Sequence, residues 1–295
     1  MITIKDFDDI VLNNPFLTGN VVGYGVHNLQ IQANINYSPD SLHLYGQSNS
    51  TCKYITIKHA KSGKEYKFVR EDDHIDVVDL TTKNYQLITD IKLLTDVKNV
   101  FTEFKTIVFN QINNYEAIMQ FIQNNKFNFH LEETRKFINL IYPTISDKNQ
   151  DNIIRVLKRV EKNPAKYLED PVDSIGFDAK NIVQSVFFSI LTDKLSKINT
   201  LHIVDSNSHF EEIKDILSPL FQELQIPTDV WLKKEITTVS AFLTYLATVL
   251  FENNYLIYDL ANDTDTYLLI YTKTENSNEL EKLATIMNLH IKKMK

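Results

Sequence analysis

The sequence predicts an α+β protein with a small N-terminal antiparallel sheet, a helical middle and a C-terminal α+β domain that ends α-β-β-α-β. Three patterns support this class. Apolar and polar residues alternate in parts of the first 75 residues, and apolar residues recur at three- and four-residue steps between about 76 and 168. After residue 239 the pattern changes to helix, strand, turn and strand.

The first 75 residues are expected to form mainly β-strands after a short leading helix. Residues 29–35 alternate between apolar and polar, as a half-buried strand does. Residues 53–58 and 65–70 flank a turn in which Gly63 takes a positive φ, so they predict a hairpin. The glycine-rich stretch 19–25 lacks both common phosphate-binding patterns, and we interpret it as a tight loop.

The middle of the chain, from about Asp76 to Leu168, is expected to hold three to five helices. Phe101, Phe104 and Val108 recur at helical spacing, and Ser146 starts a further helix. Short polar breaks separate these segments, and no repeat of fixed period is present.

A domain boundary is expected where prolines and acidic residues interrupt the helical pattern at 163–173. It divides the chain into a first domain at 1–168 and a C-terminal α+β domain at 169–295. The second domain is expected to open with an amphipathic helix at 179–198 and a short strand at 201–205.

The next helix is expected to be capped by Asn207 or Ser208, with two glutamates in its first turn. Pro219 interrupts that helical pattern and predicts a kink, or a restart with Ser218 as N-cap. The closing unit then reads as a helix ending at Phe251, strands 255–260 and 267–271, a helix at 278–287 and a strand at 289–291.

Charge is concentrated near the C-terminus. The chain has 295 residues and a net charge of −7, and residues 201–295 hold 8 Lys and Arg against 14 Asp and Glu. Such a surface repels a phosphate backbone and attracts a basic protein, so we expect a protein partner and no nucleic acid. The alternative interpretation is that the acidic surface only aids solubility.

The sequence also bounds the compartment. Cys52 is the only cysteine, so an internal disulfide is excluded, and the N-terminus lacks the pattern of a signal peptide. The longest apolar run, Val239 to Phe251, is shorter than the roughly 20 residues that span a bilayer. We therefore expect a cytoplasmic protein without membrane contact. The sequence leaves its oligomeric state open.

Residues from about Leu201 to Ile291 resemble an uncharacterised bacterial domain family of unknown function. The resemblance rests on His202-Ile-Val-Asp205 with the glutamates that follow, and on the helix, strand, Asp-x-Tyr, strand pattern that includes Asp265-Thr-Tyr267. Ser206-Asn207 stands where the family has a Trp-Lys pair. The family is similar to polymorphic-toxin immunity proteins, and the resemblance implies no catalytic residues.

Four residues are candidates for partner binding. Asp259, Asp263 and Asp265 lie in or beside the turn of the closing hairpin, and Trp231 is the only tryptophan of the chain. The three carboxylates are also typical of turns, and a tryptophan is also typical of a core. No cofactor, metal ligand or catalytic residue is assigned.

Two segments of the sequence favour chemical alternatives. Glu71, Asp72, Asp73 and Asp76 offer hard oxygen ligands for a divalent cation, although the segment also reads as a charged connector between sheet and helices. Cys52 has His27, His43 and His59 as candidate bases, without the local signature of a cysteine protease.

The expected function is therefore that of a non-catalytic bacterial protein-binding protein. An immunity-type inhibitor that occludes a cognate toxin is the specific hypothesis, because such a protein needs a complementary surface and no reactive groups. A metal-dependent hydrolase built on the acidic cluster and a scaffold protein are the alternatives.

Overall fold

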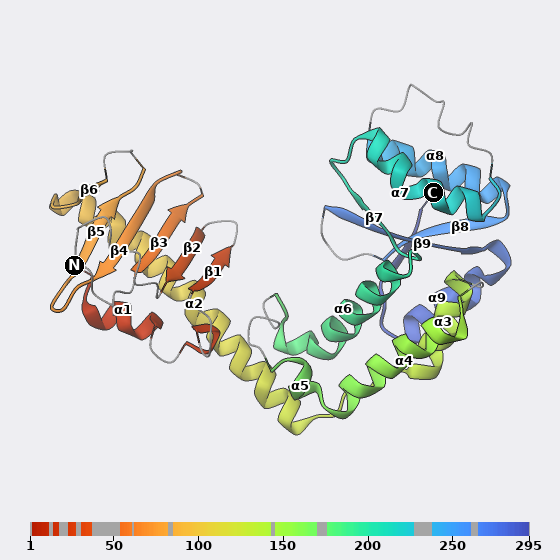
Figure 1. The fold of residues 1–295 in the computed structure, drawn as a ribbon, viewed down its shortest axis with the longest axis horizontal. Helices are drawn as coiled ribbons and strands as arrows, with labels where there is room; N and C mark the ends of the chain where they lie inside the picture. Colours follow the sequence, from red (N-terminus) through yellow and green to blue (C-terminus); the bar gives the residue numbers. More distant parts are fainter. Residues whose placement is uncertain are drawn as a thin grey trace. The chain divides into compact units, whose positions relative to one another are not determined.

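The chain forms two compact units in the computed structural model, and each contains its own antiparallel sheet (Figure 1). The α+β class predicted from the sequence is confirmed. The N-terminal unit comprises residues 1–123 and 168–179, and the C-terminal unit comprises residues 124–167 and 180–295. The expected boundary between residues 168 and 169 stays a prediction. The structure describes residues 2–11, 14–17, 23–27, 31–36, 54–60, 62–81, 85–142, 145–169, 176–226, 238–260 and 265–294.

The N-terminal unit is a six-stranded meander packed against two helices. Its strands are hydrogen-bonded in sequence order, and α1 and α2 share one apolar core with the sheet. Phe68 of the sheet and Phe101 of α2 lie 4.9 Å apart between ring centroids within that core. The elements are α1 (Ile4–Val11), β1 (Gly23–His27), β2 (Ile31–Asn36), β3 (Tyr54–His59), β4 (Glu65–Arg70), β5 (Ile75–Asp79), β6 (Gln86–Leu87) and α2 (Ile91–Asn124).

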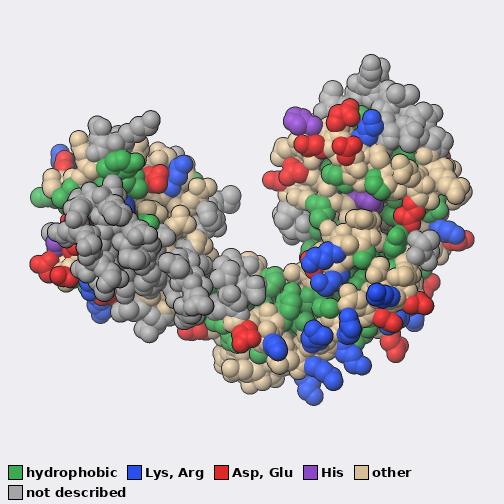
Figure 2. Space-filling model, viewed as in Figure 1, with side chains coloured by type: hydrophobic (Ala, Val, Ile, Leu, Met, Phe, Trp, Pro, Cys, Tyr) green, Lys and Arg blue, Asp and Glu red, His purple; other side chains and the backbone are tan. Residues whose placement is uncertain are grey.

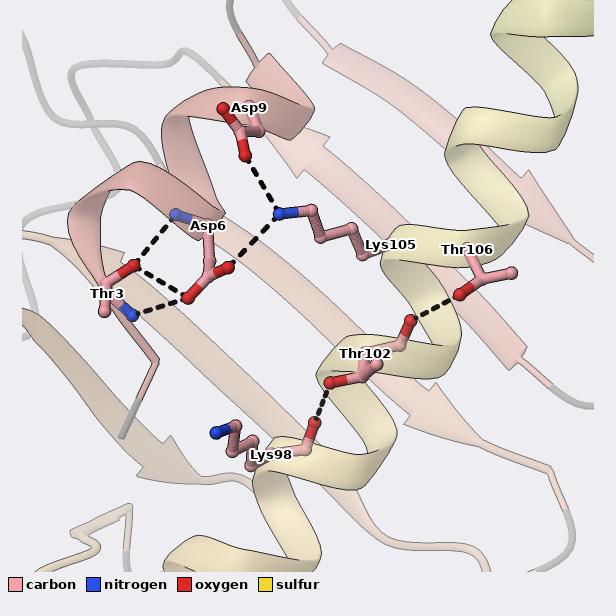
Figure 3. Close-up of polar contacts among 7 residues, drawn as sticks. All are labelled: Thr3, Asp6, Asp9, Lys98, Thr102, Lys105 and Thr106. Atoms are coloured by element: carbon pink, nitrogen blue, oxygen red, sulfur yellow. Dashed lines mark hydrogen bonds and ion pairs between the residues drawn. The ribbon is translucent and has the colours of Figure 1, made fainter.

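Helix α1 is held by ion pairs that cross the N-terminal unit (Figure 3). The Nζ of Lys105 on α2 lies 3.2 Å from Asp6 and 3.0 Å from Asp9. Asp6 also accepts hydrogen bonds from the hydroxyl and backbone N–H of Thr3, as in a capping box. The Thr3 hydroxyl, the Thr3 N–H and the Lys105 ammonium together lower the pKa of Asp6 to about 2.

The C-terminal unit is a four-stranded sheet of order β10-β8-β9-β7 with helices on both faces. Leu217 of α7 and Leu243 of α8 pack with the sheet residue Ile257 on one face. On the other face, the hydroxyl of Thr272 donates to Leu140 O at the end of α3, and Tyr258 donates to Glu281 of α9. The elements are α3 (Leu131–Ile141), α4 (Asp147–Lys162), α5 (Pro164–Tyr167), α6 (Ile182–Lys197), β7 (His202–Asp205), α7 (Phe210–Glu223), α8 (Val239–Glu252), β8 (Tyr255–Leu260), β9 (Thr266–Lys273), α9 (Ser277–Ile286) and β10 (Ile291–Lys293).

Most of the predicted elements are confirmed. The hairpin around Gly63, whose φ is +66°, joins β3 to β4, and Ser146 caps α4 by accepting from Asn149 N. The closing α-β-β-α-β order is also present, with the last strand at 291–293, two residues later than expected. The shift occurs because Leu289 N donates to Ala284 O and belongs to the end of α9.

The helical middle begins later than the sequence pattern predicts. Residues 75–79 form β5, so the interpretation of residues 71–79 as a connector is wrong for its second half. Val77 faces the core while the neighbouring acids stay partly exposed, and pairing with β4 supplies the backbone bonds. The glycine stretch is also corrected, because Gly23 and Gly25 lie in strand β1. Gly19 is outside the described residues.

Helix α7 differs from the prediction at two points. His209 is its N-cap in place of Asn207 or Ser208, because Asp205 accepts from Asn207 N and forms a turn before the helix. The helix also continues through Pro219 without the expected restart. Pro219 is exposed, and the Ser218 hydroxyl donates to Lys214 O one turn earlier, so a local polar contact accompanies the proline.

Candidate functional site

The structure describes two of the four partner-binding candidates. Trp231 and Asp263 lie outside the described residues. Asp259 lies near the end of β8, and Asp265 lies just before β9. The structure therefore places two of the four predicted side chains at the same end of the β8–β9 hairpin.

Asp259 is a structural residue of that hairpin. Its side chain is half-buried, and its Oδ1 accepts the backbone N–H of Leu268 at 2.9 Å. Burial raises the pKa of the Asp259 carboxyl, while the bond from Leu268 and the charge of Lys292 oppose that rise. This carboxylate therefore supports the strand pairing, and its role in partner binding stays a prediction.

Asp265 belongs to a larger group of exposed carboxylates around the start of α7. We define the acidic surface as the five exposed residues contributed by the end of β7, the first turns of α7 and the turn before β9: Asp205, Glu211, Glu212, Asp215 and Asp265. Figure 2 shows acidic side chains gathered around a histidine on this part of the C-terminal unit.

Local chemistry explains why these carboxylates meet. Antiparallel pairing places Asp205 opposite Thr266, and Ser206 N donates to Asp265 O at 2.8 Å. The carboxylate of Asp205 then accepts Asn207 N at 2.7 Å, which turns the chain into α7. The sequence pattern identified the glutamates of α7 only as favourable charges at a helix start, because the β7–β9 pairing that adds Asp265 is a long-range contact.

Few of the described cations form ion pairs with the acidic surface. Lys214 is the only cation that the described ion pairs bring to it, 3.7 Å from Glu211. Glu212 accepts His209 N at 3.0 Å and completes the cap of α7, so its charge also serves the helix. Beside it, Ile203 of the edge strand β7 keeps 45% of its side-chain surface exposed. The result is a negative surface with an apolar side chain at its margin.

The acidic segment at 71–79 does not form a metal centre among the described residues. The two ring nitrogens of His74 contact carboxylates, with Nδ1 2.5 Å from Asp73 and Nε2 3.2 Å from Asp76. The hydrogen bond with Asp73 raises the pKa of His74, and the same bond lowers the pKa of Asp73. These contacts form an exposed ion-pair group in which the imidazole faces carboxylates on both sides.

The histidine group around Cys52 is only partly described. Cys52 and His43 lie outside the described residues, and the side chain of His27 does too. The Nδ1 of His59 accepts Ser62 N at 3.2 Å and lies 2.9 Å from the Ser62 hydroxyl, while its Nε2 lies 3.9 Å from Glu103. The contacts with Ser62 close the β3–β4 turn, and Glu103 belongs to helix α2.

A hollow of about 610 Å³ lies at the other end of the β8–β9 hairpin. Its walls are formed by the end of α8 and by the residues that follow β9, and they include Asn254, Tyr255 and Lys273. Asn254 has φ +67°, and its backbone oxygen accepts Thr274 N at 2.9 Å. The hollow therefore lies where the chain leaves the end of α8. Among the described residues of its lining, Lys273 is the cation, and it lies 3.9 Å from Glu275.

Residues 134–294 match the profile of a protein family described as a domain of unknown function, DUF6630. The chain belongs to this family. The resemblance of residues 201–291 to a family of unknown function is therefore confirmed, and the DUF6630 match also includes α4, α5 and α6. No curated protein and no solved structure matches the chain significantly. Among the described residues of the chain, no helix is long and apolar enough to cross a membrane.

Proposed function

We propose that the protein is a non-catalytic binding protein that holds a basic protein partner on its acidic surface. The observation that carries the proposal is the convergence of five exposed carboxylates from β7, α7 and the turn before β9. Opposite charge at an interface speeds encounter and fixes orientation, and this needs no reactive group. The exposed Ile203 beside the carboxylates supplies apolar contact area at the margin.

The specific form of this proposal is an immunity-type inhibitor that occludes the active site of a toxin. A toxin that acts on nucleic acid carries a basic substrate-binding surface, because it must attract phosphates. An acidic surface presented by a folded sheet and helix can cover such a basic surface. The proposal is supported by this complementarity and by the expected similarity of the family to polymorphic-toxin immunity proteins.

The test is association with the product of the neighbouring gene, measured by surface plasmon resonance, together with protection of growth when that product is expressed. The informative variant is Glu211→Lys/Asp215→Lys, because neither side chain caps α7. We expect association to slow by about 10- to 100-fold at low salt. Glu252→Lys/Glu279→Lys makes the same change of charge on exposed residues of α8 and α9 and should leave association unchanged.

Two results would count against the proposal. One is the absence of binding and of growth protection with every neighbouring gene product. The other is an equal loss of binding in both double variants, because that would reflect net charge and not the acidic surface.

A further inference from the structure

Helix α4 carries a basic stripe on the side opposite its buried face. We define the basic stripe as Lys148, Arg155, Arg159 and Lys162, all exposed. At 3.6 residues per turn these four residues fall within a sector of about 60°. The residues of α4 that pack into the C-terminal unit lie on the other side: Gln150, Ile153, Leu157 and Val160. Figure 2 shows basic side chains along this part of the unit, away from the acidic surface.

No ion pair in the described part of the chain joins the basic stripe to the three acids of its own helix, Asp147, Asp151 and Glu161. Asp151 accepts from Arg135 of α3 at 2.8 Å, and Glu161 accepts the backbone N–H of Phe129. Arg155 donates to the neutral amide of Asn152 at 2.9 Å. None of the ion pairs found among the described residues includes a member of the stripe.

The charge of the surrounding segment strengthens this pattern. Residues 124–167 contain nine Lys and Arg against five Asp and Glu, whereas residues 201–295 contain eight against fourteen. Lys158 of α4 and Lys166 of α5 are exposed and add to the positive side. The C-terminal unit therefore separates its charges into a negative and a positive region.

The shape of the stripe favours a linear polyanion. Arg155 follows Lys148 after seven residues, and Arg159 and Lys162 follow at steps of four and three. The stripe from Lys148 to Lys162 extends about 21 Å along the axis at 1.5 Å per residue. One strand of a nucleic acid presents a phosphate about every 3.4 Å of helical rise, so this length faces about six phosphates. The two arginines can each hold a phosphate through paired N–H donors.

The surroundings of the stripe disfavour other polyanionic partners. Interfacial helices insert an apolar face into a membrane, but the apolar face of α4 is buried in the unit. Protein interfaces depend on aromatic and apolar anchors, and the exposed large apolar residues found in the described part of the chain all lie on other elements.

We propose that the basic stripe on α4 binds the phosphate backbone of a nucleic acid without reading its sequence. This site is independent of the acidic surface. The expectation of no nucleic-acid partner was drawn from the charge of residues 201–295, and the stripe lies outside that segment.

The test is fluorescence anisotropy of the full chain with a labelled 20-nucleotide DNA strand and with the corresponding duplex, from 50 to 200 mM KCl. Four phosphate contacts predict a slope of log K against log salt of about −2.8 for the single strand and about −3.6 for the duplex. Arg155→Glu/Arg159→Glu should weaken binding at least tenfold and reduce the slope to about half of its value. Lys282→Glu/Lys293→Glu makes the same charge change on exposed residues of α9 and β10 and should bind like the parent protein.

Three outcomes would overturn the proposal. The first is the absence of binding to both DNA probes at 50 mM KCl, and the second is an equal loss of DNA affinity in the two double variants. The third is stronger binding to phosphatidylserine vesicles or to polyglutamate than to DNA. Thermal unfolding of each variant checks that it is folded, which is expected because the substituted side chains are exposed. Glu211→Lys/Asp215→Lys should retain or improve DNA binding. The two proposals can therefore fail separately, because DNA binding by the basic stripe does not depend on protein binding by the acidic surface.

Discussion

The two units of the chain use charged side chains in different ways. In the N-terminal unit, ion pairs join α1 to residues far away in the sequence, with Lys105 contacting Asp6 and Asp9, and Arg70 contacting Asp8. In the C-terminal unit, most described ion pairs link residues within four positions of each other, as Lys197 and Asp193 do. The longest of them in sequence, between Arg135 and Asp151, spans 16 positions.

This difference separates a structural use of charge from an interactive one. The N-terminal unit places opposite charges in contact, so they fasten one helix to the rest. The C-terminal unit fastens its layers with apolar packing and with single hydroxyl bonds such as that of Thr272 to Leu140 O. Its exposed acidic residues form the acidic surface and exposed basic residues form the basic stripe, and both surfaces can attract partners of opposite charge.

The largest expected effect comes from removing one buried phenylalanine in each unit. Phe104 and Phe221 have no exposed surface, and each belongs to the core of its own unit. Each substitution by Ala should lower the free energy of unfolding by about 3–5 kcal/mol. Hydrogen exchange should accelerate in β3 and β4 for Phe104→Ala, and in β8 and β9 for Phe221→Ala.

Phe251→Ala is the matched control, because this side chain is 59% exposed and should change stability by less than about 0.5 kcal/mol. If both core variants accelerated exchange equally in both sheets, the two cores would be one cooperative unit, and the comparison between the units would lose its basis.

A smaller effect is expected from acid, through His202 of the C-terminal unit. Burial lowers the pKa of this histidine, which is set against α7, and a hydrogen bond with the backbone of Ile216 and the charge of Glu223 oppose the shift. The unfolded chain therefore binds the proton more readily, so stability should fall as the pH drops below the ordinary histidine pKa of about 6.5. One proton contributes at most about 1.4 kcal/mol per pH unit.

Denaturant titrations between pH 7.5 and 5 measure this slope. His202→Gln should flatten it, whereas His290→Gln, at an exposed position of the same unit, should not. A slope that is unchanged in His202→Gln would show that His202 is not the group responsible.

The sequence predicted much of the fold because its strongest patterns are local. Helical spacing and strand alternation are read within a window of about 10–15 residues, and they identified the β3–β4 hairpin and the α4 helix start at Ser146. The β5 strand was missed because its two buried valines, Val77 and Val78, stand between Asp76 and Asp79. The charges of these acids suggest a loop until the pairing of β5 with β4 is known.

Only the negative charge of the candidate site was predictable from the sequence. The charge count indicated an acidic C-terminal third, and Asp265 proved to be part of the acidic surface. The bond of Asp259 to Leu268 N was not predictable, because it depends on strand register. The basic stripe was also missed, because the total charge of residues 101–200 is nearly balanced and hides the separation of signs on α4.

A third prediction concerns the ion pairs of the N-terminal unit. Lys105→Ala removes contacts to Asp6 and Asp9 from a side chain that is only 22% exposed, and it should lower the free energy of unfolding by about 1 kcal/mol. Lys98→Ala is the control on the same helix, because Lys98 is exposed and none of the described ion pairs includes its ammonium group; the Thr102 hydroxyl donates to its backbone oxygen (Figure 3).

The destabilisation by Lys105→Ala should depend on salt concentration and on pH. The effect of Lys105→Ala should shrink in 1 M NaCl because screening weakens the ion pairs in the parent protein. It should also shrink as the pH falls through about 2, because Asp6 keeps its charge down to that pKa. An effect that is independent of both would indicate lost packing of the lysine stem.

The smallest expected effect tests the other side of the comparison. Lys197 lies 2.7 Å from Asp193 one helical turn away, and its side chain is 65% exposed. Lys197→Ala should lower the free energy of unfolding by no more than about 0.5 kcal/mol, although this contact is shorter than either contact of Lys105. The reason is that the helix already fixes both residues, so the pair orders nothing further. If Lys197→Ala destabilised the chain as much as Lys105→Ala, local pairs would hold the C-terminal unit together, and its surface charges would lose their distinct role.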